Sequence, residues 1–258
     1  MRRETKRLEP TLSPNAEEEA FLAAYDAAAF PHPSVAVDVA AMTTGGGSLH
    51  ALLVRRTAPP HKGRYALAGG FVGFSESLDD AAARVVAAKG GLSGIFLEQL
   101  YTFGAVDRDP RTRVLSVAYY ALVEEARLRA AAPAAGEAVV ARLDVPWTGL
   151  EGGPVRAQGD RGRELPLALD HSEILGRAVQ RLRGKLDYSP IGFQLLPRQF
   201  TLRQLQEVHE AVLGRKLNKD SFRRSVVASG LVAATGELEK DVPYRPAELY
   251  RYVAARER

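Results

Sequence analysis

The segment at residues 69–91, GGFVGFSESLDDAAARVVAAKGG, most narrowly limits how this chain can fold, because glycines bound it at both ends. Ser77 can cap a helix, two aspartates follow in its first turn, and the pair Gly90 and Gly91 stops it. The segment therefore predicts a loop, a helix that runs through Ala88, and a second loop.

Length and composition indicate the broad class of protein. At 258 residues the chain is longer than one comfortable hydrophobic core, so we expect two domains. Apolar residues make up 46% and charged residues 26%, as in ordinary globular proteins. No apolar run of about eighteen residues occurs, residues 1–14 lack the apolar centre of a secretory signal, and cysteine is absent. We therefore expect a cytoplasmic protein without a membrane segment.

The N-terminal half alternates strand and helix patterns. Residues 1–15 are polar, basic and interrupted by proline, which predicts a flexible arm, and Asn15 can cap the short helix that follows. Two β-rich stretches joined by a glycine turn predict a hairpin. The expected strands lie at residues 34–44, 50–57, 98–104, 113–123 and 138–143. Residues 148–163 are rich in glycine and charge, and we expect a long surface loop there.

From residue 170 the pattern becomes helical. Asp170 or Ser172 can cap a helix, whose apolar side is formed by Ile174, Leu175, Ala178, Val179 and Leu182. Residues 187–190, Asp-Tyr-Ser-Pro, predict a domain boundary, because the residue before a proline is biased away from helix.

Two short helices and two extended segments are expected after this boundary. Residues 201–214 form the first helical pattern, and residues 218–230 form the second, with Phe222, Val226 and Val227 facing inwards. Two extended segments around a polar turn follow. This order is typical of a winged helix-turn-helix.

Positive charge gathers in the same region. From residue 171 to 258 there are 16 Lys and Arg against 10 Asp and Glu. The second helix carries Lys219, Arg223 and Arg224 on its outer side, and a helix of this kind suits the major groove of DNA. A small helical domain that only mediates dimerisation remains the alternative.

The segment at 69–91 also matches most of a known motif. The Nudix signature runs from a glycine and a glutamate to Arg-Glu-apolar-any-Glu-Glu-any-Gly-apolar. Gly70, Glu76, Arg84, Val86, Gly91 and Leu92 fall in register with it. The three helical glutamates are replaced by Val85, Ala88 and Lys89. Valine and alanine cannot ligate Mg²⁺, and the ammonium of Lys89 would repel a metal ion and attract a diphosphate.

Taken together, the chain resembles the Nudix-related transcriptional regulators of NAD metabolism of the NrtR type. The most specific stretches lie at residues 21–38, 100–123, 170–197 and 200–230. The resemblance implies an α+β fold with a Nudix-like α/β/α sandwich and mixed sheet at 16–170, a connecting helix at 171–189 and a winged helix-turn-helix at 190–258. It further implies a homodimer on a palindromic DNA operator, with ADP-ribose or a related NAD-pathway metabolite as effector and no catalysis, metal or cofactor.

The resemblance also assigns candidate site residues. For the effector pocket these are Arg55, Arg56, Arg64, Glu76, Lys89, Tyr101, Phe103, Arg108 and Arg113. For DNA they are Arg203, Gln204, Asn218, Lys219, Ser221, Arg223 and Arg224. The missing acids, and Ala68 where the family often has proline, leave open an effector other than ADP-ribose.

Two other functions remain open on the sequence. One is a Nudix hydrolase of ADP-ribose or another nucleoside diphosphate sugar, with metal held by acids outside the box such as Asp79, Asp80 or Glu98. The other is a structural dimer that binds neither ligand nor DNA.

Overall fold

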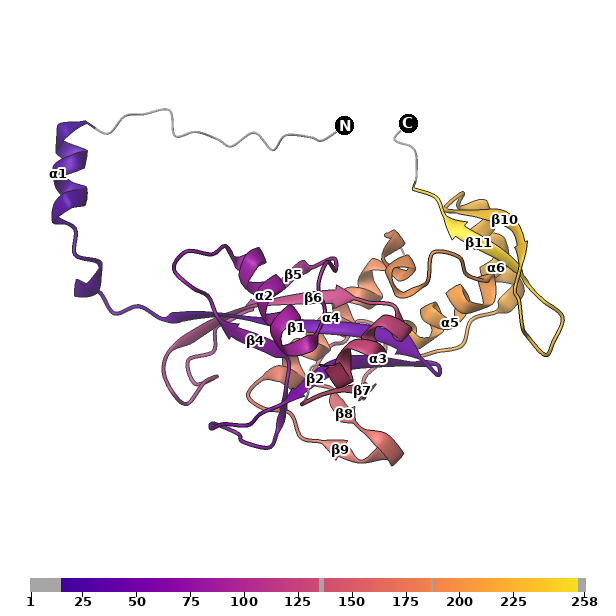
Figure 1. Ribbon diagram of the computed structural model, residues 1–258, viewed down its shortest axis with the longest axis horizontal. Helices are drawn as coiled ribbons and strands as arrows, with labels where there is room; N and C mark the ends of the chain where they lie inside the picture. Colours follow the sequence, from indigo (N-terminus) through magenta and orange to yellow (C-terminus); the bar gives the residue numbers. More distant parts are fainter. Residues whose placement is uncertain (1–14, 135–136, 187, 255–258) are drawn as a thin grey trace. The chain divides into compact units, whose positions relative to one another are not determined.

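The computed structural model describes residues 15–134, 137–186 and 188–254 (Figure 1). Contacts divide the chain into residues 1–33 and Ser34–Arg258. The first part contains α1 (Ala16–Ala24) and the short 3-10 helix η1 (Ala27–Ala29). Asn15 caps α1 as predicted, because its Oδ1 accepts a hydrogen bond from the Glu18 amide at 2.9 Å. The rest of the predicted arm lies outside the described residues.

The second part is built on one mixed β-sheet. In the described residues the strands are β1 (Ser34–Gly45), β2 (Ser48–Arg55), β3 (Tyr65–Ala66), β4 (Ala68–Phe71), β5 (Glu98–Phe103), β6 (Val114–Leu122), β7 (Ala138–Asp144), β8 (Arg156–Gln158) and β9 (Glu164–Leu165). Their order is β5-β6-β1-β2-β7-β8-β9, with β3 on β2 and β4 on β1. The pair β1 and β6 is parallel and the predicted β1–β2 hairpin is antiparallel. The mixed sheet is confirmed.

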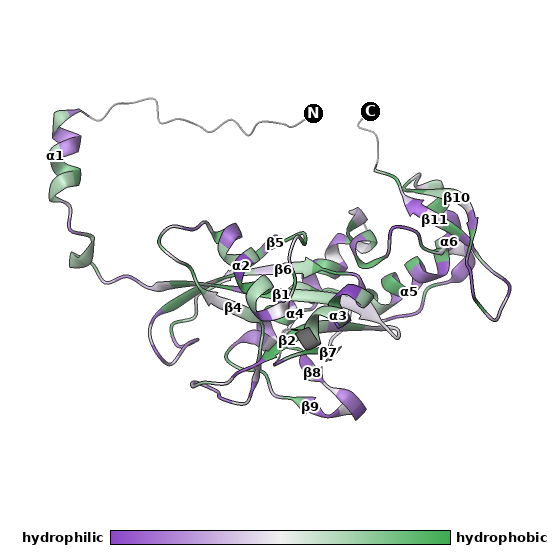
Figure 2. Cartoon of the chain, viewed as in Figure 1, coloured by the Kyte–Doolittle hydropathy of each residue, from purple (hydrophilic) through white to green (hydrophobic). Residues whose placement is uncertain are grey.

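Helices cover both faces of the sheet, which confirms the α/β/α sandwich (Figure 1). On one face lie α2 (Leu78–Gly90) and α3 (Glu125–Ala134), packed on Val37, Val39 and other buried residues. On the other lies α4 (His171–Lys185), packed on Ala40 and Met42. Because successive side chains of a strand point to opposite faces, β1 is apolar over most of its length and contributes to both cores. Figure 2 shows this hydrophobic band across β1 and β6.

The helix of the Nudix-like segment forms as predicted. The Ser77 hydroxyl accepts a hydrogen bond from the Asp80 amide at 3.1 Å. Gly91 ends the helix with φ 67°, the left-handed conformation in which glycine is not strained. These local signals define the residues at which α2 begins and ends.

The predicted long loop at 148–163 is wrong in part. Residues Arg156–Gln158 form β8, which pairs with β7, and Val155 and Ala157 are buried. The strand is too short to produce a recognisable alternation, so pairing with β7 and β9 defines it. Helix α3 was also missed, because its alanine-rich sequence shows little amphipathic contrast.

Helix α4 carries the predicted buried side. Ile174, Leu175, Ala178, Val179 and Leu182 are all inaccessible to solvent. Asp170 holds the N-cap position, but its carboxylate makes no hydrogen bond to the helix backbone. It bonds to Arg108 instead, so long-range pairing replaces the expected local cap.

The C-terminal module is a winged helix-turn-helix, as predicted. It consists of η3 (Pro190–Leu195), α5 (Leu202–Leu213), α6 (Lys219–Ala228), β10 (Val232–Leu238) and β11 (Glu248–Tyr252). Thr201 and Gln204 form a capping box at the start of α5. Phe222 and Val226 pack on a core around Phe200, Leu205 and Tyr250. The inward position predicted for Val227 is wrong: half of it is exposed, because a ten-residue helix on one small core buries only a narrow stripe.

None of the helices among the described residues combines the length and the apolar character needed to span a lipid bilayer.

Candidate functional site

A cavity of about 660 Å³ opens where β4, the end of α2 and the start of α4 meet. This size suits a nucleotide-sized ligand. We refer to it as the sensing pocket. Four of the predicted effector residues line its wall, namely Arg55, Arg56, Lys89 and Arg108.

The other predicted effector residues lie outside that wall. Arg113 donates to the carbonyls of Gly104 and Ala105, and Arg64 is exposed on the loop before β3. Tyr101 and Phe103 pack edge to face with ring centroids 5.3 Å apart, and Arg177 covers the Tyr101 ring. A role for these residues in effector binding stays a prediction.

Glu76 supports the loop before α2. Its carboxylate accepts two hydrogen bonds from Arg84, at 2.8 and 2.5 Å, and one from the Gly73 amide at 2.6 Å. The bonds from Arg84 lower the pKa of Glu76 to about 2, and the Gly73 bond adds to the effect. These three hydrogen bonds hold the loop against α2, and Glu76 does not line the sensing pocket.

Of the three replaced positions of the Nudix helix, Ala88 and Lys89 line the pocket and Val85 is buried. Lys89 Nζ donates to the Gly69 carbonyl at 2.5 Å, and Ala88 lines the wall beside it. Val85 is buried and packs beneath Gly70. A Cβ atom added to Gly70 would lie 3.1 Å from a methyl carbon of Val85. Burial lowers the pKa of Lys89, while Asp38 acts in the opposite direction.

These residues do not fit a magnesium ion. Mg²⁺ requires several oxygen ligands, and the positions that would supply them carry an alkyl group, a methyl group and a cation. Within the residues that the structure describes, no group of three or more His, Asp or Glu side chains is placed to hold a metal.

A buried polar cluster forms the deep side of the pocket. Asp38 on β1 accepts a hydrogen bond from the Ser116 hydroxyl at 2.5 Å and lies 3.6 Å from both Arg108 and His171. Arg108 donates two bonds to Asp170, at 2.8 and 2.7 Å. The guanidinium of Arg108 is therefore committed to carboxylates of the protein, which argues against the bidentate phosphate contact predicted for it.

His171 joins this cluster to the start of α4. Its Nδ1 accepts a hydrogen bond from the Leu67 amide at 2.9 Å, so the proton of the neutral ring sits on Nε2, which faces Asp38. Burial lowers the pKa of His171, although Asp38 and Asp170 oppose the shift. The first residue of α4 is thus tied to the pocket.

The sequence analysis missed six polar residues that line the pocket, namely Asp38, Thr57, Asp109, Arg111, Glu137 and His171. Arg111 bonds to Asp109 at 2.7 and 3.0 Å, and its guanidinium lies 5.3 Å from the centre of the Phe71 ring. One signal was available, since Asp38 is a lone carboxylate in an apolar strand.

The winged helix presents a basic concave face. A hollow of about 620 Å³ lies between α5, α6 and β11, and its basic lining residues are Arg203, Lys216, Lys219, Arg223 and Arg245. Arg245 and Lys216 were not predicted. Lys219, Ser221, Arg223 and Arg224 are exposed on α6, as DNA contacts would require.

Three other predicted DNA residues have local partners. Gln204 accepts from the Thr201 amide at 2.7 Å, and Asn218 caps α6 through the Ser221 amide at 3.0 Å. Arg203 pairs with Glu207 at 2.9 Å. Their side chains shape the helix ends and surface, and contact with DNA stays a prediction for them.

Comparison with known proteins agrees with both halves of this architecture. The NrtR DNA-binding winged helix domain matches residues 192–252, and the NUDIX domain matches residues 32–152. The ADPR responsive transcriptional repressor NtrR of Acinetobacter baylyi is 34% identical over 237 residues, which cover 91% of this chain and 88% of that protein.

The chain belongs to the NrtR family of transcriptional regulators.

A solved structure of the family has the same fold. The Shewanella oneidensis NrtR complexed with a 27mer DNA has a TM-score of 0.67 and 31% identity, covering 85% of this chain and 93% of that one. A shorter match is the ADP-ribose pyrophosphatase of Methanocaldococcus jannaschii, 35% identical over 88 residues, which are 34% of this chain and 50% of that enzyme. This NrtR-family protein therefore joins a Nudix domain to a DNA-binding winged helix.

Proposed function

We propose that this protein is a transcriptional repressor that binds operator DNA and is released by ADP-ribose or a related NAD-pathway metabolite. The observation that carries the proposal is the sensing pocket, where Lys89 projects from the Nudix helix in place of a metal-binding glutamate. A pocket that binds without hydrolysis suits a sensor, because destruction of the effector would erase the signal.

The charge of the pocket rim supports a diphosphate ligand. Arg55, Arg56 and Lys89 supply cations, and guanidinium groups suit phosphate oxygens. A lysine at the floor can take over the electrostatic role that a divalent ion has in a hydrolase. The relative from Acinetobacter baylyi, named as ADPR responsive, makes ADP-ribose the first effector to test.

Helix α4 provides a physical link between effector and DNA. Asp170 and His171 tie its first turn to the pocket. Near its last turn, Arg183 donates to the Val212 carbonyl of α5 at 2.8 Å. A ligand that shifts the pocket wall can therefore move α4 and the winged helix together. Two copies of the chain would place two winged helices on a palindromic operator.

The proposal is tested by measuring effector binding and operator release together. Thermal shift identifies which NAD-pathway metabolite binds, and the same metabolite is expected to release a labelled fragment of the protein's own upstream DNA. Absence of DNA binding at low salt would contradict a repressor.

A second assay separates the sensor from a hydrolase. ADP-ribose incubated with the protein and Mg²⁺ is expected to remain intact. Release of AMP that disappears in the Glu76→Gln variant would instead show that the protein is a hydrolase.

A further inference from the structure

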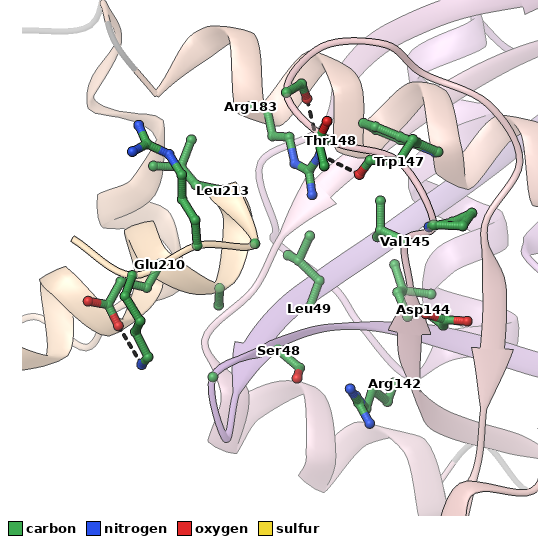
Figure 3. A pocket seen from close by; sticks show the side chains of 18 of the residues that line it. Ser48, Leu49, Arg142, Asp144, Val145, Trp147, Thr148, Arg183, Glu210 and Leu213 are labelled. Atoms are coloured by element: carbon green, nitrogen blue, oxygen red, sulfur yellow. Dashed lines mark hydrogen bonds and ion pairs between the residues drawn. The ribbon is translucent and has the colours of Figure 1, made fainter.

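A second and larger cavity lies between the Nudix sheet and the winged helix. Its volume is about 760 Å³. Arg142, Asp144 and Trp147 stand on the sheet side, and Glu210 and Leu213 stand on the α5 side (Figure 3). We refer to it as the junction cleft. It shares no lining residue with the sensing pocket.

Arg183 of α4 forms the end wall of the junction cleft and is only 5% exposed. Its Nε donates to the Val212 carbonyl at 2.8 Å, and its Nη1 donates to the carbonyls of Trp147 and Gly149 at 3.3 and 3.1 Å. Its guanidinium carbon lies 4.6 Å from the centre of the Trp147 ring. Arg183 therefore joins three segments of the chain at one point.

No acidic side chain of the described residues neutralises the charge of Arg183. Among the described residues no carboxylate lies within the 4.0 Å of an ion pair, and only carbonyl dipoles and the Trp147 ring face the guanidinium. The Nη2 atom of Arg183 makes no hydrogen bond within the described residues. It lies close to Gly214, where an added Cβ atom would be 3.1 Å from Nη2. Burying a cation without a counter-charge is costly, so the arrangement favours an anion from outside the chain.

Other cations face the same space. Arg142 and Arg215 line the cleft and make no ion pair within the described residues. The acids there are already engaged, since Glu210 bonds to Lys216 at 2.7 Å and Asp144 lies 4.0 Å from Arg156 outside the cleft. Leu49, Val145 and Leu213 supply apolar surface between the charged groups (Figure 3).

We propose that the junction cleft is a second ligand site that binds a phosphorylated small molecule, with Arg183 at the end wall receiving the phosphate and Arg142 and Arg215 adding positive charge along the walls. Phosphate matches the fork of a guanidinium, and the cleft volume accommodates a sugar phosphate or nucleotide with room for the apolar contacts. Because the walls come from both domains, the ligand would tie the winged helix to the Nudix sheet. The site stands independently of the effector proposed for the sensing pocket.

Trp147 makes the site directly observable, because it is the only tryptophan of the chain. Titration of the full-length protein with ribose 5-phosphate, and separately with inorganic pyrophosphate, is expected to change its fluorescence saturably with at least one of them. Arg142→Glu and Arg215→Glu remove exposed cations and are each expected to raise the apparent dissociation constant about tenfold or more. Thermal unfolding confirms that both variants are folded.

Two controls decide the origin of the signal. Arg163→Glu makes the same charge change at an exposed residue outside the cleft, and Lys89→Ala alters the sensing pocket; both are expected to keep the wild-type dissociation constant. The proposal is overturned by a flat titration with both probes, by equal weakening in Arg163→Glu, or by a signal that only Lys89→Ala abolishes.

Discussion

Lys89 illustrates how one side chain can redirect a site. The match to the Nudix signature predicts that Lys89 stands where an active enzyme has a metal-binding glutamate, and its ammonium donates to the Gly69 carbonyl at the pocket floor. Glycine is required at residue 69, because a Cβ atom there would lie 2.0 Å from a carboxylate oxygen of Asp38. In our proposal, Lys89 replaces the negative charge of that glutamate with a positive charge.

Replacement of Lys89 tests this inversion. Lys89→Ala is expected to weaken ADP-ribose binding about tenfold, because one charge-assisted contact to the diphosphate is lost. Lys89→Arg keeps the charge and is expected to retain most of the affinity. Calorimetric titration measures both. Equal affinity of Lys89→Ala and wild type would show that the ammonium does not contact the ligand.

His171 predicts a specific loss of stability in acid. The folded state keeps the imidazole neutral because burial lowers its pKa below the ordinary 6.5, whereas the unfolded chain takes up a proton at that pH. The free energy of unfolding therefore falls as the pH drops below 6.5, by up to about 1.4 kcal/mol per pH unit for this one proton.

His171→Asn retains an acceptor for the Leu67 amide and cannot be protonated. Urea unfolding between roughly pH 7 and pH 5 is expected to show a shallower decline for this variant than for the wild type. Parallel declines would assign the acid sensitivity to other groups, such as His50, whose pKa burial also lowers.

At the scale of elements, helix ends were predictable and short strands were not. The caps at Ser77, Thr201 and Asn218 act over three residues, so their signal is complete in the local sequence. Strand β8 has no such signal, because it is defined by pairing with β7 and β9. The same distinction separates the cap of α6 from its exposed cations, because their proposed partner is DNA and no local pattern identifies the contact.

Helix α6 is expected to set the salt dependence of operator binding. Lys219→Ala, Arg223→Ala and Arg224→Ala each remove one cation from its exposed surface. Each variant that loses a phosphate contact should lower the slope of log affinity against log salt by about 0.9. Gel-shift titrations at several salt concentrations give the slope. Arg156→Ala, on the Nudix sheet, is the matched control and should leave it unchanged.

At the scale of the whole molecule, α4 is the element that both domains hold. Lys185 bonds to Glu98 of β5 at 2.5 Å, and Arg181 donates to the Leu100 carbonyl at 3.0 Å. With Asp170 at one end and Arg183 at the other, the helix is fastened along its length. Ligands at the two ends can therefore influence each other through it, and such coupling must be reciprocal.

Asp170→Asn is expected to weaken this coupling selectively. The amide keeps the size of the side chain and removes the charge that holds Arg108. Operator affinity without effector should stay near the wild-type value, while the factor by which ADP-ribose lowers it should shrink. Fluorescence anisotropy with labelled operator measures both quantities. An unchanged factor would place the coupling outside the α4 tie.

Local sequence was enough to predict the Nudix-like helix and the winged helix, because each is encoded within a few turns of chain. The polar cluster of Asp38, Arg108, Asp170 and His171 was not predictable, since its members come from a strand, a loop and a helix start that meet only in the folded protein. The junction cleft was not predictable for the same reason, because its walls come from both domains. Pairs that approach through packing of distant segments leave no periodicity in the sequence, so tertiary contact alone defines them.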